Sequence, residues 1–457
     1  MGTIERTSIL LTLVAVAGLT AYASLRAMED DKKPPVEDPP PRAAAAPRPE
    51  AKPLSDQVKK GIDFLVEHQL PNGGWAQGEE AAAMRGGGSG EPATVANVGD
   101  TCISALALIR AGNTPKEGTY DKNVARAVAF VTAQVEKSAA DDLSVTDVKN
   151  TRLQSKLGPY VDTFLTSMLL AEVKGKMPSP ESEKNTVVAL DRVIHKITKN
   201  QKADGTWTDA GWAPVLAQSL AGKGLNRAAQ MGTKVEDRVL ALAEKNARDN
   251  LKPAADGTAV ATKPLTSDPV SVSFARESAP AIAGGAGGLR MAGDANVPLY
   301  GFAANAAAGQ DAINTRKLAE ADLKKVADDP KAPKEEREKA QTKLKDLETN
   351  AKAQEEATKA VVQRLGDKQF IQGFGSNGGE EFLSYMQISE TLLAKGGKEW
   401  QDWDKSMTEN LGRIQNPDGS WSGHHCITGR TFCTATALLV LMADRAPVPV
   451  PKADPKK

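Results

Sequence analysis

One spaced triplet, Gln-x-x-x-Gly-x-Trp, occurs three times in this chain and accounts for three of its six tryptophans. Each copy follows a segment with the apolar periodicity of an amphipathic helix. A repeated unit of this size cannot bury a core alone, so copies must stack to be stable. The sequence therefore predicts a helical repeat protein. The three copies are Gln69-Gly73-Trp75, Gln201-Gly205-Trp207 and Gln415-Gly419-Trp421.

The spacing within the triplet has a local physical explanation. A Gln in the last helical turn can hydrogen-bond the backbone groups that a helix end leaves free. The Gly permits the positive φ that reverses the chain, and the indole packs back over the turn. We therefore expect all nine triplet residues to be structural.

Six amphipathic segments are candidate outer helices, and an apolar stretch rich in Ala, Ser and Thr follows each of them after a loop. Small side chains let inner helices approach closely, and Leu and Ile at three- and four-residue spacing face an outer layer. The sequence thus predicts six helical hairpins. The outer candidates are residues 55–69, 122–134, 185–201, 235–250, 354–369 and 399–415.

The triplets resemble the QW motif of the superfamily that contains squalene cyclases and the β-subunits of protein prenyltransferases. The resemblance implies an all-α fold, an α/α toroid in which about six hairpins close one ring over residues 55–445. It is more informative about fold than about activity, because this fold also carries non-catalytic domains.

The N-terminal residues are typical of an exported protein. An uncharged apolar run over residues 9–23 follows Arg6 and contains the small-x-small sequence Ala21-Tyr22-Ala23, so residues 1–27 are predicted to be a signal peptide or a membrane anchor. Eight prolines between Pro34 and Pro53 make residues 28–54 an extended linker. We expect a periplasmic or cell-envelope location, with membrane contact only through the N-terminus.

Two insertions and a tail complete the predicted organisation. Residues 251–297 are a Gly/Ala-rich loop, and residues 312–360 are a charged helical insertion that Pro330 and Pro333 divide in two. Residues 446–457 form a C-terminal tail. The 58 basic and 58 acidic residues cancel, and no basic stripe interleaved with aromatics occurs, so nucleic acid is not an expected partner.

Candidate site residues gather where inner helices are predicted to begin. Two of the four His and two of the three Cys lie in residues 424–433. A zinc site, a nucleophile–base pair and a disulfide all remain open for them. The catalytic or metal candidates are Asp100, Cys102, His425 and Cys433; the cavity-lining candidates are Tyr160, Asp162, Trp212, Tyr300, Glu380, Glu381 and Tyr385.

The resemblance adds a specific zinc expectation. Prenyltransferase β-subunits hold zinc with an Asp-x-Cys at the start of one inner helix and a His near the start of the next. Asp100-Thr101-Cys102 has that form. In the last repeat the matching position is closer to Cys433, with His425 upstream, and the chain order is reversed relative to the family.

Cyclase chemistry is not expected. The Asp-x-Asp-Asp and Asp-Asp-x-x-Asp acid motifs of terpenoid cyclases are missing from the sequence, and aromatic residues make up only 4% of the chain. We expect a binding or scaffold protein for a peptide, glycan or lipid. The alternative is a zinc- or Cys/His-dependent enzyme related to prenyltransferases. Paired acid catalysis by Glu380 and Glu381 is weaker, because adjacent helical residues point about 100° apart.

Overall fold

A computed structural model describes residues 51–78, 94–251 and 293–447. The predicted signal peptide or anchor, all but the last four residues of the predicted linker, most of the Gly/Ala-rich loop and most of the tail lie outside these residues. The described residues belong to one compact unit, and its described elements are helices, which confirms the all-α prediction. None of these described helices is long and apolar enough to cross a membrane.

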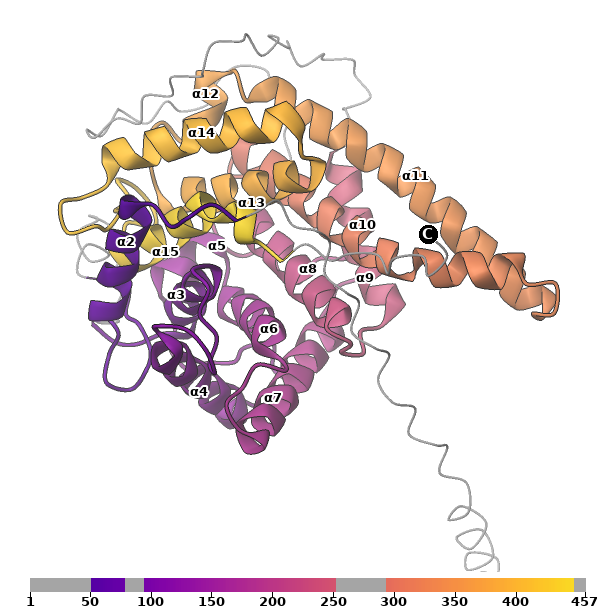
Figure 1. Ribbon diagram of the computed structural model, residues 1–457, viewed down its shortest axis with the longest axis horizontal. Coiled ribbons are helices and arrows are strands. Elements are labelled where there is room, and N and C mark those ends of the chain that lie inside the picture. Colours follow the sequence, from indigo (N-terminus) through magenta and orange to yellow (C-terminus); the bar gives the residue numbers. More distant parts are fainter. Residues whose placement is uncertain (1–50, 79–93, 252–292, 448–457) are drawn as a thin grey trace, which may run out of the picture. The chain divides into compact units, whose positions relative to one another are not determined.

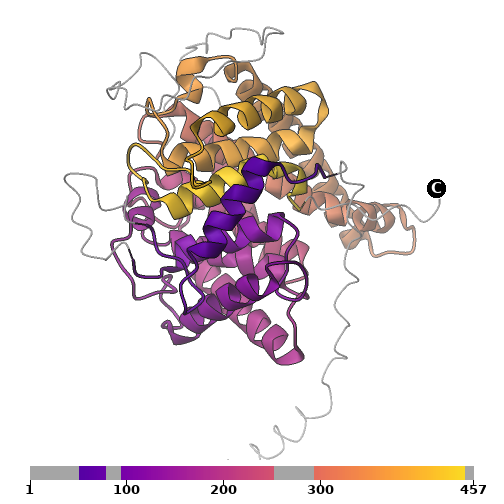
Figure 2. The same ribbon diagram turned by 60° about the vertical axis from the view of Figure 1, so that its left-hand side comes forward.

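Six helices rich in small and apolar residues make up the inner layer (Figures 1 and 2). Each of them packs against the next along the chain, and the last packs against the first. All 13 residues of the second are buried, which explains why it has no polar face. The inner helices are α3 (Val98–Arg110), α6 (Val161–Val173), α8 (Pro214–Gln230), α10 (Pro298–Asp328), α13 (Gly379–Lys395) and α15 (Arg430–Leu441).

Six amphipathic helices cover the inner layer and bury one face each. On the second of them the buried positions recur every three or four residues, from Val124 to Val135. Two short helices, α5 (Arg152–Leu157) and α12 (Lys368–Ile371), lie in the connections, and a third, η2 (Ala443–Arg445), follows the last inner helix. The outer helices are α2 (Asp56–Glu67), α4 (Asp121–Lys137), α7 (Pro180–Lys199), α9 (Asp237–Asn250), α11 (Lys334–Arg364) and α14 (Gly397–Ile414).

The glutamine of each triplet connects one outer helix to the following one. Its Nε2 donates to the carbonyl of the Gly in its own turn and to a carbonyl in the first turn of the next outer helix. For Gln69 these acceptors are Gly73 and Asn123, at 2.8 and 2.9 Å. Gln201 bonds Gly205 and Val239 in the same way, and Gln415 bonds Gly419 and Gln57. The last of these bonds joins α14 to α2, at opposite ends of the sequence.

The glycine and tryptophan of the triplet complete this joint. The three glycines have φ of +90°, +89° and +86°, and a Cβ on any of them would lie closer than 3.0 Å to a backbone carbonyl of the neighbouring outer helix. Each indole Nε1 donates to the carbonyl ten residues earlier, on Leu65, Ile197 and Leu411, at 2.7–2.9 Å. The triplet is therefore a structural joint between neighbouring repeats.

The charged segment 312–360 is not a separate insertion, which corrects the predicted boundary. Helix α10 is an inner helix with buried residues up to Ile313 and then continues without a break to Asp328. Helix α11 returns from Lys334 and becomes an outer helix. The only prolines in residues 299–364 are Pro330 and Pro333, so α10 ends just before the first of them and α11 begins just after the second. Figure 1 shows this hairpin extending beyond the neighbouring helices.

Candidate functional site

Glu381, in the first turn of α13, is the centre of a buried polar cluster. Its carboxylate accepts hydrogen bonds from the backbone N–H of Gly378 (2.9 Å) and of Phe374 (3.0 Å). The Tyr300 hydroxyl of α10 donates to the same carboxylate at 2.5 Å, and His425 Nε2 lies 3.1 Å from Glu381 Oε2. Glu381 thus caps its own helix and ties it to α10 and to the loop before α15.

Two glycines make the close packing around these side chains possible. Gly373 has φ of +60°, and a Cβ there would collide with the carboxylate of Glu381. A Cβ on Gly378 would lie within about 3 Å of the His425 ring. Substitution at either position would push the acidic and basic groups apart.

Glu380 is less well satisfied than its neighbour. It is completely buried, and its Oε2 accepts one long hydrogen bond, 3.3 Å, from the N–H of Ile427. Its Oε1 has no hydrogen-bond partner. Burial, followed by the negative charge of Glu381, raises the pKa of Glu380 to about 7, although His425 opposes this. A buried carboxylate oxygen without a donor is unusual and requires an explanation.

His425 brings positive charge to the cluster from the loop between α14 and α15. Its Nε2 lies 2.9 Å from the carbonyl oxygen of Ser376, and its Nδ1 is buried without a partner. Burial alone would lower the pKa of His425, but the negative charges of Glu381 and Glu380 raise it to about 11. The imidazole therefore carries a proton at neutral pH and is not available as a general base.

Aromatic rings border this cluster. The Trp212 ring centroid lies 5.8 Å from that of Tyr300 and 5.1 Å from that of Phe374, and the Phe374 centroid lies 5.1 Å from that of His425. Trp212 and Phe374 remain partly exposed. The structure thus brings together four of the predicted cavity-lining residues with one predicted catalytic residue.

The other cavity-lining candidates lie elsewhere. The Tyr385 hydroxyl donates to the carbonyl of Ile371 at 2.7 Å inside the core. Asp162 accepts from the Gly99 N–H (2.9 Å) and from Gln154 Nε2 (2.8 Å), which joins α6 to α3 and α5. Tyr160 is the N-cap residue of α6, half-buried, with no capping bond from its side chain.

Asp100 is a second incompletely satisfied carboxylate. Its Oδ2 accepts from Asn97 Nδ2 at 2.8 Å, while its Oδ1 is buried with no partner. Burial raises the pKa of Asp100 to about 7; the bond from Asn97 lowers it and the charge of Asp162 adds to the rise.

The three cysteines are free and buried, so the disulfide alternative is not realised in this structure. Cys102 Sγ lies 3.6 Å from the Thr166 hydroxyl, and Cys433 Sγ donates to the carbonyl of Ile427 at 3.5 Å. Burial raises the pKa of both thiols. Both sulfurs are therefore thiols at neutral pH in the metal-free chain, whereas a nucleophile must be a thiolate.

The predicted ligand set of Asp100, Cys102, Cys433 and His425 does not converge. Within the described residues, one group of three metal-ligating residues has its ligand atoms within 4.8 Å of one another, and it consists of Glu380, Glu381 and His425. Asp100 and Cys102 are two positions apart on α3, so their side chains point about 200° apart. Sequence reasoning named both glutamates, but not their pairing with His425.

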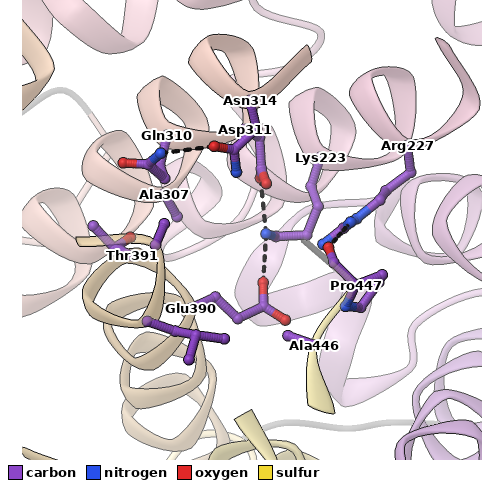
Figure 3. Close-up of a pocket in the computed structure, with 12 residues that line it drawn as sticks. Lys223, Arg227, Ala307, Gln310, Asp311, Asn314, Glu390, Thr391, Ala446 and Pro447 are labelled. Atoms are coloured by element: carbon purple, nitrogen blue, oxygen red, sulfur yellow. Dashed lines mark hydrogen bonds and ion pairs between the residues drawn. The ribbon is translucent and has the colours of Figure 1, made fainter. Parts of the chain in front are cut away.

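A second charged cluster joins α3, α6, α8, α10 and α13, and Figure 3 shows the part of it around Lys223, Asp311 and Glu390. Lys223 of α8 is buried between Asp311 of α10 (2.8 Å) and Glu390 of α13 (2.6 Å). Arg110 of α3 makes two hydrogen bonds of 2.9 Å to Glu172 of α6 and lies 3.5 Å from Glu390. These groups line or adjoin a cavity of about 10 Å³, room for about one water.

We call this second cluster the ion network. Arg227 donates to the carbonyl of Pro447, and its charge also acts on Glu390, so it is the third cation beside the three acidic groups. Burial would raise the pKa of Glu390, but the charges of Lys223, Arg110 and Arg227 lower it to about 2. Sequence reasoning missed the network, although the signal was present as isolated charges inside otherwise apolar inner segments.

An open groove lies along the distal half of the α10–α11 hairpin. Its volume is about 670 Å³. Its floor is apolar, and four carboxylates border it against two lysines. The apolar lining residues are Ala319, Leu323, Val326 and Ala340; the charged ones are Asp322, Glu335, Glu336, Glu338, Lys339 and Lys343.

No protein-family model matches the chain, and no curated protein matches it significantly.

Proposed function

We propose that this chain is an exported or membrane-tethered QW-repeat α/α toroid that acts as a binding scaffold and has no cyclase activity. The ring is supported by the order of inner-helix contacts, in which α15 packs against α3. It is also supported by the bond from Gln415 to Gln57, which repeats between α14 and α2 the joint found between α2 and α4.

The Cys/His-dependent enzyme has less support. Such an enzyme needs a thiolate and a neutral imidazole within reach of each other. Here burial raises the pKa of Cys102 and Cys433, and the carboxylate of Glu381 holds His425 in its charged form.

The observation that carries the scaffold proposal is the groove on the projecting α10–α11 hairpin. Two helices with an apolar seam between them accept a third amphipathic helix, which inserts apolar residues at three- and four-residue spacing. Four of the six charged residues that line the groove are carboxylates; Lys325, Lys339 and Lys334 pair with Asp322, Glu335 and Glu338, and Glu336 lies outside these three pairs. We therefore propose that the occupant is an amphipathic helical peptide segment with basic residues flanking its apolar stripe.

Peptide binding to the full chain tests this proposal. Two labelled synthetic helices share one apolar face and carry flanking Lys in one case and flanking Glu in the other. We expect fluorescence anisotropy to show tighter binding of the Lys helix, with an affinity that falls as salt rises. Val326→Lys places a cation in the groove and should abolish this preference.

Val188→Lys is the matched control, because Val188 is exposed on α7, away from the groove. Equal binding of the two helices, or binding that Val326→Lys leaves unchanged while circular dichroism shows a normal fold, would refute the groove as the docking site.

The export part of the proposal has its own test. A reporter that is active only outside the cytoplasm, fused after Glu50, should give signal. Activity of a cytoplasmic reporter at the same position would refute export.

A further inference from the structure

We propose that Glu380, Glu381 and His425 form a binding site for one divalent transition-metal cation. The ligand atoms of these three side chains lie within 4.8 Å of one another. They come from two elements, the first turn of α13 and the loop before α15, which the cation would hold together.

The donor atoms are already close to the spacing of a coordination shell. His425 Nε2 lies 3.1 Å from Glu381 Oε2 and 2.9 Å from the carbonyl oxygen of Ser376. Nitrogen and oxygen ligands lie about 2.0–2.2 Å from such a cation, so neighbouring ligands are roughly 3.0–3.5 Å apart. Small side-chain movements would therefore place Glu380, Glu381 and His425 on one ion, with the Ser376 carbonyl as a fourth donor; the cation takes the place of the imidazole proton, which is released to solvent.

The unpartnered oxygen of Glu380 distinguishes a ligand site from a helix cap. Glu381 alone accepts the Gly378 N–H, so capping of α13 does not require Glu380. Glu380 is nevertheless completely buried, and its Oε1 has no hydrogen-bond partner. A buried carboxylate oxygen without a donor destabilises the folded chain. A cation would satisfy it.

Local packing holds the histidine where the cation requires it. A Cβ on Gly378 would lie within about 3 Å of the His425 ring, so only glycine lets the ring approach the start of α13 this closely. Tyr300 and the Phe374 N–H fix the Glu381 carboxylate by donating to its other oxygen. Groups that orient a ligand in this way are typical of metal sites.

The donor set indicates which cations would bind. Two carboxylates, one carbonyl oxygen and one imidazole are borderline-hard ligands, which suit Mn²⁺, Co²⁺ or Zn²⁺. Cys433 donates its S–H to the Ile427 carbonyl and is not among the donors. The site thus differs in residues and chemistry from the Asp-x-Cys and His set of the prenyltransferases. It is also independent of the scaffold proposal, because the hairpin groove lies on α10 and α11.

Cobalt titration of the full chain tests the site. Protein stripped with a chelator is titrated with Co²⁺, and the visible absorption of the bound ion reports its ligands and stoichiometry. We expect one equivalent to bind, Zn²⁺ to compete, and the melting temperature to rise with excess metal. Glu380→Gln keeps the shape of the side chain and leaves Glu381 unchanged; it should weaken Co²⁺ binding by at least about tenfold.

Asp100→Asn is the matched control. Asp100 also has an unpartnered buried oxygen in the first turn of an inner helix, but it lies outside the three-residue group. Its substitution should leave Co²⁺ affinity unchanged. His425→Gln provides a second variant that should remove the nitrogen ligand and change the absorption spectrum.

Three results would overturn the site. The first is that the wild-type chain does not bind Co²⁺ at millimolar concentration. The second is that folded Glu380→Gln binds Co²⁺ as tightly as the wild type. The third is that Asp100→Asn loses as much Co²⁺ affinity as Glu380→Gln.

Discussion

The two ends of the inner helices both bury charge, yet they differ in whether that charge is balanced. At the ion network, Arg110, Lys223 and Arg227 face three acidic groups on α6, α10 and α13. At the other end, Glu380 and Asp100 each keep a buried oxygen without a donor. A charge-balanced buried network is best explained as architecture, even though Arg227 Nε also lacks a hydrogen-bond partner, whereas the unpartnered oxygens of Glu380 and Asp100 belong to carboxyl groups that other carboxylates adjoin.

Helix α13 shows this difference within a single element. Glu380 and Glu390 are ten residues apart, about 15 Å along the helix axis. The pKa of Glu390 is lowered to about 2, and that of Glu380 is raised to about 7. Both carboxyl groups are buried, so the charges of their neighbours decide whether the pKa is raised or lowered. Cations surround Glu390, while a second carboxylate adjoins Glu380.

The largest effect is expected when the central cation of the ion network is removed. Lys223→Met keeps the length of the side chain but leaves Asp311 and Glu390 buried without it. We expect a loss of about 3–5 kcal/mol in the free energy of unfolding. Urea denaturation at neutral pH measures it. A loss close to zero would mean that the network does not stabilise the packing of the inner helices, and the comparison would fail.

The second prediction concerns acid stability. The folded pKa of Glu390, about 2, lies below its ordinary value of 4.5. The folded state therefore binds fewer protons, and this stabilisation is present above pH 4.5 and lost as pH falls towards 2. It amounts to about 3 kcal/mol, since one pKa unit corresponds to about 1.4 kcal/mol. Glu390→Gln should lack this component of the acid transition; a variant with the wild-type pH profile would contradict the assignment.

The third prediction has the opposite sign. The folded pKa of Asp100, about 7, lies above its ordinary value of 3.8. The folded state therefore binds more protons, so stability falls as pH rises from about 4 to 7 and is level above that. As pH rises from 5 to 8, the free energy of unfolding of Asp100→Asn should increase by roughly 2–3 kcal/mol relative to that of the wild type. Thermal melts at both pH values measure the gain, and a pH-independent difference would show that Asp100 is satisfied.

The smallest effect is expected at the proposed metal site without metal. Glu380 makes only one long hydrogen bond and is protonated below its folded pKa of about 7, so at pH 5 Glu380→Gln should change the stability of the chelator-treated chain by less than about 1 kcal/mol. With Co²⁺ present the wild type alone should gain stability. A loss as large as that of Lys223→Met would place Glu380 in the architecture, like Glu390.

Sequence reasoning succeeded where the determining physics is local. Periodicity located the helices, and the triplet chemistry follows from one turn, as the bonds of Gln69 and Trp75 show. The boundary at residue 312 was misplaced because a change from apolar to charged residues does not end a helix. The ring closure assumed from the resemblance stays a prediction.

Site prediction failed where the determining contacts are distant in sequence. Arg110 and Glu172 are 62 positions apart, and Lys223 and Glu390 are 167 positions apart. No local sequence pattern can therefore predict either ion pair. The Asp-x-Cys pattern suggested a shared site, but a helix directs Asp100 and Cys102 to different neighbours. The pairing of His425 with α13 depends on how a loop folds back.

The bond from Gln415 to Gln57 has a consequence for where the chain opens. The described residues nearest the two termini also meet: the Lys52 N–H donates to Asp444 at 2.8 Å, and Arg445 donates to the Lys52 carbonyl at 2.6 Å. The first and last repeats are joined by the same glutamine hydrogen bond as consecutive repeats. Their junction therefore differs from the others only in that no backbone connection crosses it. A circular permutant that links this pair of ends and opens at an exposed turn such as Gly175 should keep every joint, so the order in which the repeats are synthesised is separable from the order in which they pack.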